Sequence, residues 1–345
     1  MKILLLSEDV SDYGAAFYQR DFINCLDNTH TVELYGPGTT QYNNTDTIDD
    51  VISKCEFTPD LICIGHKWLG DTPNTNVNPH PPIDLNNTSI PCTIILNKEY
   101  TNFEEKIAYI ESNNIPLVFT HHHKADQWLD EYDPEFIFWP FAVNATEFKD
   151  YGEDYQYDLS FSGRLRNPNP DVPQTDVRIR AQQELYYSIG QLKLIRRPQY
   201  RDYSIFFRGR PTSEHLHRIS KVLHREQRLP DEDYKRLYNR SKLSFNTLSP
   251  IDLVGTRYYE SMASKSLAFC QESSIYTEYD LFEPGTHCVT FSDDLSDFHE
   301  LLQYYVDNDE EREAIAKAGH DHVHENHTWE KRVEQFTEIV QRELL

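Results

Sequence analysis

The sequence predicts an α/β protein made of two Rossmann-like, doubly wound domains. The chain has 345 residues, more than one hydrophobic core usually organises. Strand-like apolar runs alternate with helical patterns in two successive series, which is typical of parallel sheets covered by helices. A polar, acidic stretch at residues 144–157 separates the two series. Sheets of this kind bind ligands at the carboxyl ends of their strands.

The first series begins with a buried strand. The apolar run Ile3–Leu6 is short and is followed by Ser7, Glu8 and Asp9, which favours a strand over a signal peptide. Further apolar runs and helical patterns follow along the chain. The expected strands are Ile3–Leu6, Thr31–Tyr35, Leu61–Gly65, Thr93–Leu96, Pro116–Phe119 and Phe136–Trp139, and the expected helices are Ala15–Leu26, Phe103–Ser112 and His123–Glu131.

The second series repeats the alternation and ends in an amphipathic helix. Thr328 can cap this last helix, whose apolar stripe runs from Trp329 to Val340. The other expected elements are strand Asp158–Ser162, helix Arg178–Ile189, strand Ser204–Arg208, helix Asp231–Arg240, strand Leu243–Asn246, helix Arg257–Ser264, strand Leu267–Gln271 and strand Cys288–Phe291. Two Rossmann-like halves follow from this order.

Charge and composition limit the classes of partner. The formal net charge is 33 − 57 = −24, which disfavours binding to nucleic acid or to anionic lipid. No apolar run reaches the roughly 18 residues of a membrane span, and six scattered cysteines indicate reduced thiols, so we expect a cytoplasmic protein. Basic residues gather in one span, which is equally compatible with a positive field aimed at a diphosphate and with an ordinary solvated face: Arg164, Arg166, Arg178, Arg180, Lys193, Arg196, Arg197, Arg201, Arg208 and Arg210.

The segment from Asp252 to Glu260 carries the strongest functional signal. Two carboxylates stand eight positions apart, with Gly255 and Thr256 between them at the start of a predicted helix. A helix N-terminus offers N–H groups to a diphosphate, Arg257 adds charge, and Glu260 can accept two ribose hydroxyls. Asp252 is also compatible with a simple turn after Pro250, because aspartate is a favoured turn former.

This segment resembles the Asp/Glu-x7-Glu signature of GT-B glycosyltransferases. The surrounding sequence resembles the spore-maturation-protein-like branch of the group-1 transferases over residues 135–336. The matching segments are Trp139–Asn144, Tyr157–Arg164, Leu243–Asn246, Leu281–Gly285, Val289–Asp293, Glu310–Gly319 and His327–Arg332.

The resemblance implies a GT-B fold, two Rossmann-like domains facing across a cleft. It implies an acceptor domain at 1–150, a nucleotide-sugar domain at 151–327, and a last helix at 328–345 that crosses back to the first domain. It implies a hexosyl- or pentosyltransferase, with Asp252 near the donor sugar. The expected donor-binding residues are Gly163, Arg164, Arg208, Asn246, Gly255, Thr256, Arg257, Tyr258, Glu260 and, in the first domain, Gly14.

Polar residues after strands of the first domain are candidates for the acceptor site. Lys98 and Glu99 follow one expected strand and His121 follows the next. An inverting enzyme would need one of them as a base, whereas a retaining enzyme would use them to orient the acceptor. The two-acid motif of the resembled families favours retention. Each of these residues is also compatible with a polar loop.

We expect no cofactor and no metal. No Asp-x-Asp follows an expected strand in the placement that metal-dependent GT-A enzymes use, and histidines 320, 322, 324 and 327 lack a nearby cysteine. A solvated helix face explains these histidines better. The expected partners are a UDP- or GDP-linked sugar as donor and a glycan, glycoconjugate or small molecule as acceptor. Two other functions stay open: a GT-B epimerase acting on nucleotide-sugars, and a catalytically silent sugar- or partner-binding protein.

Overall fold

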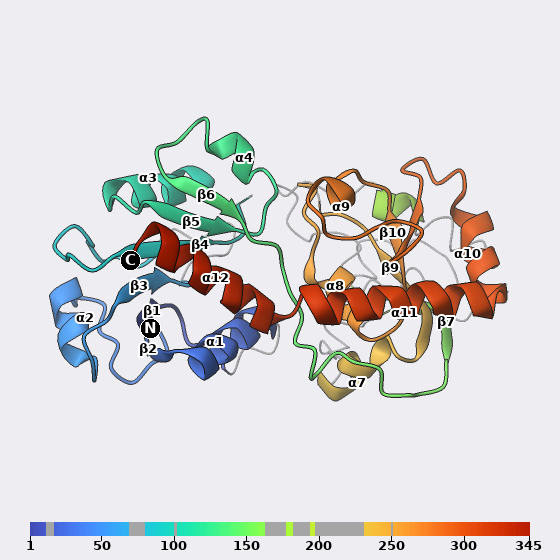
Figure 1. Ribbon diagram of the computed structural model, residues 1–345, viewed down its shortest axis with the longest axis horizontal. Helices are drawn as coiled ribbons and strands as arrows, with labels where there is room; N and C mark the ends of the chain where they lie inside the picture. The colour runs from blue at the N-terminus through green and yellow to red at the C-terminus, as the bar shows by residue number, and fades with distance from the viewer. Residues whose placement is uncertain are drawn as a thin grey trace, which may run out of the picture. The chain divides into compact units, whose positions relative to one another are not determined.

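The protein forms two compact units, shown in Figure 1. A computed structural model describes residues 1–11, 17–68, 80–99, 102–162, 177–181, 194–196, 231–249 and 251–345. The first unit comprises Met1–Ala142 and Trp329–Leu345, and the second comprises Val143–Thr328. The sequence placed these boundaries at 150/151 and 327/328.

The first unit is a six-stranded parallel sheet in the order β2-β1-β3-β4-β5-β6. Its strands are β1 (Lys2–Leu6), β2 (Thr31–Tyr35), β3 (Leu61–Ile64), β4 (Cys92–Leu96), β5 (Leu117–Thr120) and β6 (Glu135–Phe138), and its helices are α1 (Phe17–Thr29), α2 (Ile48–Lys54), α3 (Phe103–Ser112), α4 (Ala125–Trp128) and α12 (Trp329–Glu343). This is the doubly wound arrangement that the sequence predicted.

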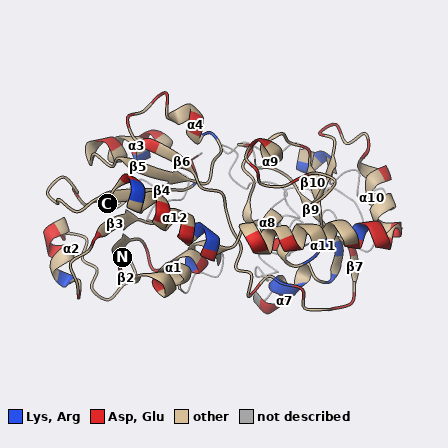
Figure 2. Cartoon of the chain, viewed as in Figure 1, with Lys and Arg blue, Asp and Glu red and all other residues tan. Residues whose placement is uncertain are grey.

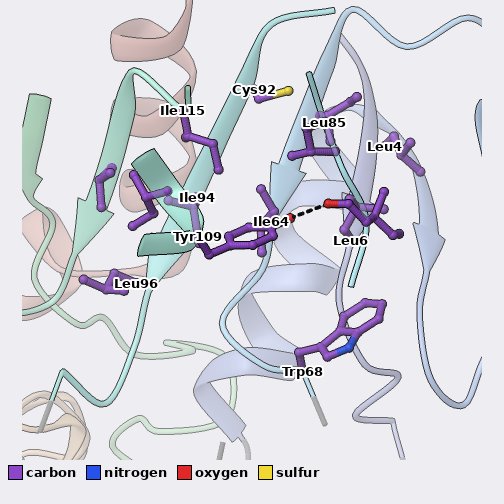
Figure 3. Packing of buried hydrophobic residues seen from close by; sticks show 14 of the residues in the cluster. Leu4, Leu6, Ile64, Trp68, Leu85, Cys92, Ile94, Leu96, Tyr109 and Ile115 are labelled. Atoms are coloured by element: carbon purple, nitrogen blue, oxygen red, sulfur yellow. Dashed lines mark hydrogen bonds between the residues drawn. The ribbon is translucent and has the colours of Figure 1, made fainter. Parts of the chain in front are cut away.

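Both faces of this sheet are buried. Successive residues of a strand point to opposite sides of the sheet, so each strand contributes to two clusters of buried side chains. Ile3 and Leu5 pack with residues of α1 and α12, including Phe336. Leu4 and Leu6 pack on the other face, in the cluster that Figure 3 shows. The C-terminal helix thus covers one face of the first sheet, and its predicted apolar stripe is buried there.

The second unit is a five-stranded parallel sheet in the order β11-β10-β9-β7-β8. Its strands are β7 (Tyr157–Phe161), β8 (Leu194–Arg196), β9 (Ser241–Asn246), β10 (Leu267–Gln271) and β11 (Val289–Phe291), and its helices are α7 (Asp231–Leu237), α8 (Thr256–Ala263), α9 (Ile275–Glu278), α10 (Phe298–Asp307) and α11 (Asp309–Asn326). Strand β9 lies in the centre of the sheet, so the loop that follows it emerges at the middle of the carboxyl edge.

Some elements differ from the sequence prediction. Strand β8 and helices α2, α9 and α10 were not predicted, and α4 is shorter than the expected helix 123–131. A capping box starts α2, because Thr47 accepts from the Asp50 backbone and the Asp50 side chain accepts from Thr47 N–H. The expected strand Ser204–Arg208 and most of the expected helix Arg178–Ile189 lie outside the described residues.

Acidic residues are distributed over helices of both units, as Figure 2 shows. The first turns of α2 and α11 contain Asp49, Asp50, Asp309, Glu310 and Glu311. Negative charge in these positions complements the positive end of a helix dipole. Among the described residues, no helix is both long enough and apolar enough to span a membrane.

Gly319 brings α11 into close contact with the second unit's core. A Cβ at this position would lie 2.3 Å from the backbone oxygen of His287 and 3.5 Å from Met262 Cγ of α8. Backbone cannot move aside as a flexible side chain can. Glycine therefore permits the close approach of α11 to the backbone of His287.

We expect Gly319→Ala to lower the free energy of unfolding by about 1–3 kcal/mol, because the overpacking outweighs the better helix propensity of alanine. Chemical denaturation measures this loss. Lys317→Ala is the control, since Lys317 lies exposed on the same helix. A Gly319→Ala protein as stable as the parent would show that α11 has room to shift.

Candidate functional site

A tight turn positions Asp252 in the loop between β9 and α8. The Ser249 hydroxyl accepts hydrogen bonds from the backbone N–H groups of Ile251 (3.3 Å) and Leu253 (3.0 Å). Asp252 itself has a left-handed backbone with φ of 61° and an exposed side chain. Aspartate tolerates this conformation better than most residues. The carboxylate is thus held at the surface of the second unit, where its predicted contact with a donor sugar stays a prediction.

In the described part of the chain, no side chain caps the N-terminus of α8. Gly255 is the N-cap residue, with extended backbone (φ −85°, ψ 173°), and no acidic residue stands in the first turn. A Cβ on Gly255 would meet nothing within 4 Å among the described residues. No side chain of the described residues caps the first N–H groups of α8, and N–H groups in this position favour anions.

Two arginines lie against Phe161 beside this helix terminus. The guanidinium carbons of Arg178 and Arg257 are 5.5 and 5.8 Å from the Phe161 ring centroid. Arg178 is buried and donates to Thr247 Oγ1 (2.9 Å) and to the Leu248 carbonyl oxygen (3.3 Å), in the loop after β9. Burial and then the charge of Arg257 lower the pKa of Arg178 to about 9.

Arg257 has an unsatisfied donor. Its Nε is buried and has no hydrogen-bond partner among the residues that the structure describes. A like-charged pair with a buried, unsatisfied N–H is costly unless an anion binds there. The Arg178–Arg257 pair therefore fits a phosphate-bearing ligand. Sequence reasoning counted Arg178 only as part of the basic span, because nothing in its local pattern links it to α8.

Glu260 lies one turn into α8 and is 6% exposed. Its Oε2 accepts from the hydroxyl of Tyr234 at short range and from that of Tyr238 at 3.5 Å. Tyr238 Oη is also 2.6 Å from Ser162 Oγ, at the end of β7. The predicted ribose ligand is thus a buried carboxylate held by tyrosines that sequence reasoning missed.

Two other predicted donor-binding side chains face the interior of the second unit. Asn246 is 1% exposed and donates from Nδ2 to the Ser244 carbonyl oxygen (3.2 Å) and to Ser261 Oγ (3.3 Å). Tyr258 is fully buried, with its hydroxyl 3.1 Å from that of Tyr276. Asn246 thus ties α8 to β9, whereas Tyr258 ties α8 to α9. Their contact with a donor stays a prediction. The predicted Gly14, Gly163, Arg164 and Arg208 lie outside the described residues.

In the first unit, the ends of β3 and β5 bring two histidines together. His66 Nε2 and His121 Nε2 are 2.9 Å apart, and the rings are stacked. His121 Nδ1–H donates to the Trp139 carbonyl oxygen at 2.7 Å, so its Nε2 accepts from His66. Burial lowers the pKa of His121 to about 3. His121 is therefore neutral at physiological pH, with both ring nitrogens engaged.

Lys98 and Glu99 follow β4 beside this pair. Lys98 has a left-handed backbone, and its carbonyl oxygen accepts from Lys106 Nζ at 3.2 Å. Glu99 is 7% exposed and accepts a short hydrogen bond from the Thr120 hydroxyl. The buried Lys106 of α3 thus fixes the loop that carries both predicted residues.

A small cavity opens at the same strand ends of the first unit. Its volume is about 20 Å³, enough for one water molecule. Its polar lining consists of His66, His80, Asn97 and Lys106. Polar residues therefore converge where the sequence predicted the acceptor site, although the predicted roles of Lys98, Glu99 and His121 remain predictions.

Comparison with known proteins relates part of the chain to a family. Residues 195–338 match the family model described as glycosyl transferase-like. Residues 195–338 are thus glycosyltransferase-like, within a chain of GT-B fold. The match and the fold confirm the predicted resemblance and support a glycosyltransferase enzyme, as the sequence predicted. No curated protein matches the chain in sequence.

Solved structures similar to this GT-B chain span its whole length. A sucrose-phosphate synthase from Thermosynechococcus elongatus has a TM-score of 0.61 at 11% identity, covering 99% of this chain and 98% of that one. HepE of Anabaena, in complex with UDP and glucose, has a TM-score of 0.58 at 12% identity, and the match covers 99% of this chain and 100% of HepE. An α-glucosyltransferase in complex with UDP-glucose and DNA has a TM-score of 0.63 at 9% identity, covering 99% of each chain.

The histidines of α11 in the GT-B chain make hydrogen bonds rather than forming a solvated face. His320 Nδ1 and His324 Nε2 lie 2.7 and 3.2 Å from the carbonyl oxygen of Ala263, at the end of α8. Their partial burial corrects the expectation from the sequence. Histidine N–H groups at a helix C-terminus satisfy carbonyls that the helix leaves unpaired. These histidines thus support the helix that carries Glu260.

Proposed function

We propose that the protein transfers a hexosyl or pentosyl group from a UDP-linked sugar to a hydroxyl of a glycan, glycoconjugate or small-molecule acceptor. The observation that carries this proposal is the Arg178–Arg257 pair beside the uncapped N-terminus of α8, with Glu260 one turn along the same helix. The arginines and helix N–H groups suit a diphosphate, and the buried carboxylate suits ribose hydroxyls. One short helix then presents both parts of a nucleoside diphosphate site.

The choice of uridine rests on the similar structures. HepE was solved with UDP-glucose as well as with UDP and glucose, and the α-glucosyltransferase was solved with UDP-glucose. We extend that donor class to this protein. No additional cofactor is required by the reaction, because the nucleotide is the leaving group.

We further propose that the reaction retains the configuration of the sugar. An inverting reaction needs a base that deprotonates the acceptor hydroxyl. His121 is poorly suited to that role, because burial lowers its pKa to about 3 and both ring nitrogens are engaged. In a retaining reaction, His121 and Glu99 orient the acceptor, Lys98 adds positive charge near it, and Asp252 contacts the donor sugar.

We propose that charge on the leaving diphosphate is neutralised by protein groups rather than by a metal ion. Arg257, Arg178 and the N–H groups of α8 supply fixed positive charge where negative charge develops. The six cysteines are all free thiols, which supports action in a reducing compartment such as the cytoplasm.

Ligand-induced stabilisation and transfer assays test this function. At about 100 times its dissociation constant, UDP should add about 2.7 kcal/mol to the free energy of unfolding, and GDP should add less. Sugar transfer from the matching UDP-sugar should proceed unchanged in EDTA, with NMR showing the donor's anomeric configuration in the product. Preference for GDP would refute the choice of base, and inversion would refute retention. A rate lost in EDTA and restored by manganese would refute metal independence.

A further inference from the structure

The carboxylate of Glu260 belongs to a buried polar cluster that spans three elements. Tyr234 of α7 is 3% exposed, Tyr238 just after α7 is 1% exposed, and Ser162 after β7 is 4% exposed. We define these residues with Glu260 as the tyrosine cluster. Residues four apart lie on one face of a helix, so α7 directs both tyrosines toward α8.

Both tyrosine hydroxyls converge on the same oxygen of Glu260. Tyr234 donates to Oε2 at short range, Tyr238 lies 3.5 Å from Oε2, and the two hydroxyls are 3.5 Å apart. A carboxylate has about four acceptor positions, so two donors on one oxygen do not exhaust its capacity. These two donors constrain the orientation of the carboxylate.

Packing prevents the tyrosines from swinging away. The Tyr234 ring meets the Phe148 ring edge to face at 5.7 Å and the Tyr238 ring at 5.9 Å. Burial and then the nearby Glu260 raise the pKa of Tyr238, so its hydroxyl keeps the proton that it donates. Ring packing therefore holds Tyr234 in place, and the Tyr238 hydroxyl stays a donor.

The cluster also reaches the end of β7. Tyr238 Oη is 2.6 Å from Ser162 Oγ. Ser162 directly precedes Gly163 and Arg164, the turn that the sequence predicts at the phosphates. The position of the Glu260 carboxylate is thereby fixed relative to the backbone that enters this turn.

We propose that Tyr234 and Tyr238 are positioning residues that hold Glu260 in the orientation needed to accept the 2′- and 3′-hydroxyls of a ribonucleotide. This inference rests on the proposed function, because it assigns the ribose of UDP to Glu260. The two tyrosines then determine the preference for ribonucleotides over deoxyribonucleotides. Tyr234 contributes more than Tyr238, since its contact with Oε2 is the shorter one.

The test compares two ligands on matched variants by isothermal titration calorimetry. The ligands are UDP and 2′,3′-dideoxy-UDP, which lacks both ribose hydroxyls. Tyr234→Phe keeps the ring and removes only the donor. It should weaken UDP binding by about tenfold, the effect of one hydrogen bond to a charged group, and leave dideoxy-UDP binding unchanged. Tyr238→Phe should change the UDP affinity in the same direction by a smaller factor.

Tyr305→Phe is the matched control. Tyr305 of α10 is also buried and donates to a carboxylate, at 3.4 Å from Glu311 Oε1, within the same unit. Its loss should alter neither affinity. A general loss of structure would weaken both ligands together, whereas the proposal requires a change in the ratio of their affinities.

The outcomes separate this inference from the proposed function. If the parent protein prefers UDP to dideoxy-UDP and both tyrosine variants keep the full preference, the inference is wrong and the proposed function stands. If the parent protein binds both ligands equally, Glu260 does not bind the ribose hydroxyls. The inference then fails together with the assignment of the ribose to Glu260. If Tyr234→Phe does not fold, the ratio measured on Tyr238→Phe decides.

Discussion

Glu260→Gln should weaken the binding of UDP by about ten- to a hundredfold while the protein stays folded. The substitution removes the negative charge that two ribose hydroxyls and two tyrosine hydroxyls would share, and hydrogen bonds to a charged group contribute about 1.5–3 kcal/mol each. The loss should exceed that of Tyr234→Phe, because the carboxylate makes the contact that the tyrosine only orients. Isothermal titration calorimetry with UDP gives the affinity, and thermal unfolding verifies the fold.

Glu311→Gln is a suitable control for this experiment. Glu311 accepts from Tyr304 and Tyr305 as Glu260 accepts from Tyr234 and Tyr238, but it lies exposed on α11. The control should bind UDP as the parent protein does. An unchanged UDP affinity in Glu260→Gln would remove Glu260 from the nucleotide site.

Most of the fold could be predicted from the sequence because buried parallel strands are continuous apolar runs. The run Leu267–Gln271 was assigned within its exact bounds, and the stripe Trp329–Val340 identified α12. Strand β8 gave no such signal, since its three residues stand in an arginine-rich span. Helix α2 had a different signal in the sequence. Thr47 and Asp50 have the spacing of a capping box, and this spacing was overlooked.

The candidate site, too, could be predicted only in part from the sequence. The segment from Asp252 to Glu260 is local in sequence, so its motif could be recognised directly. Arg178 and Tyr234 reach that segment only through the sheet order, which places β9 between β7 and β10. A single sequence does not record which distant residues a crossover brings together. Tertiary structure was therefore needed to find the second arginine and the tyrosine cluster.

Arg257→Gln should slow sugar transfer by about 100- to 1,000-fold, the usual effect of removing one group that stabilises developing charge. The guanidinium groups of Arg257 and Arg178 both lie near the Phe161 ring, where we expect the diphosphate to leave. Glutamine keeps part of the stem and a polar end, so packing is largely preserved. Turnover of the UDP-sugar and its affinity are measured on the same variant.

The stability of Arg257→Gln distinguishes a functional arginine from a structural one. In the ligand-free protein, Arg257 repels the buried Arg178 and has an unsatisfied Nε among the described residues, so its loss should leave the free energy of unfolding unchanged or increase it. Arg180→Gln is the control. Arg180 lies in the same described segment as Arg178, residues 177–181, but donates to the Asp293 carbonyl oxygen. The Arg180→Gln protein should transfer sugar normally. A variant that is destabilised yet fully active would show that Arg257 supports the fold, and the anion site would have to be sought elsewhere.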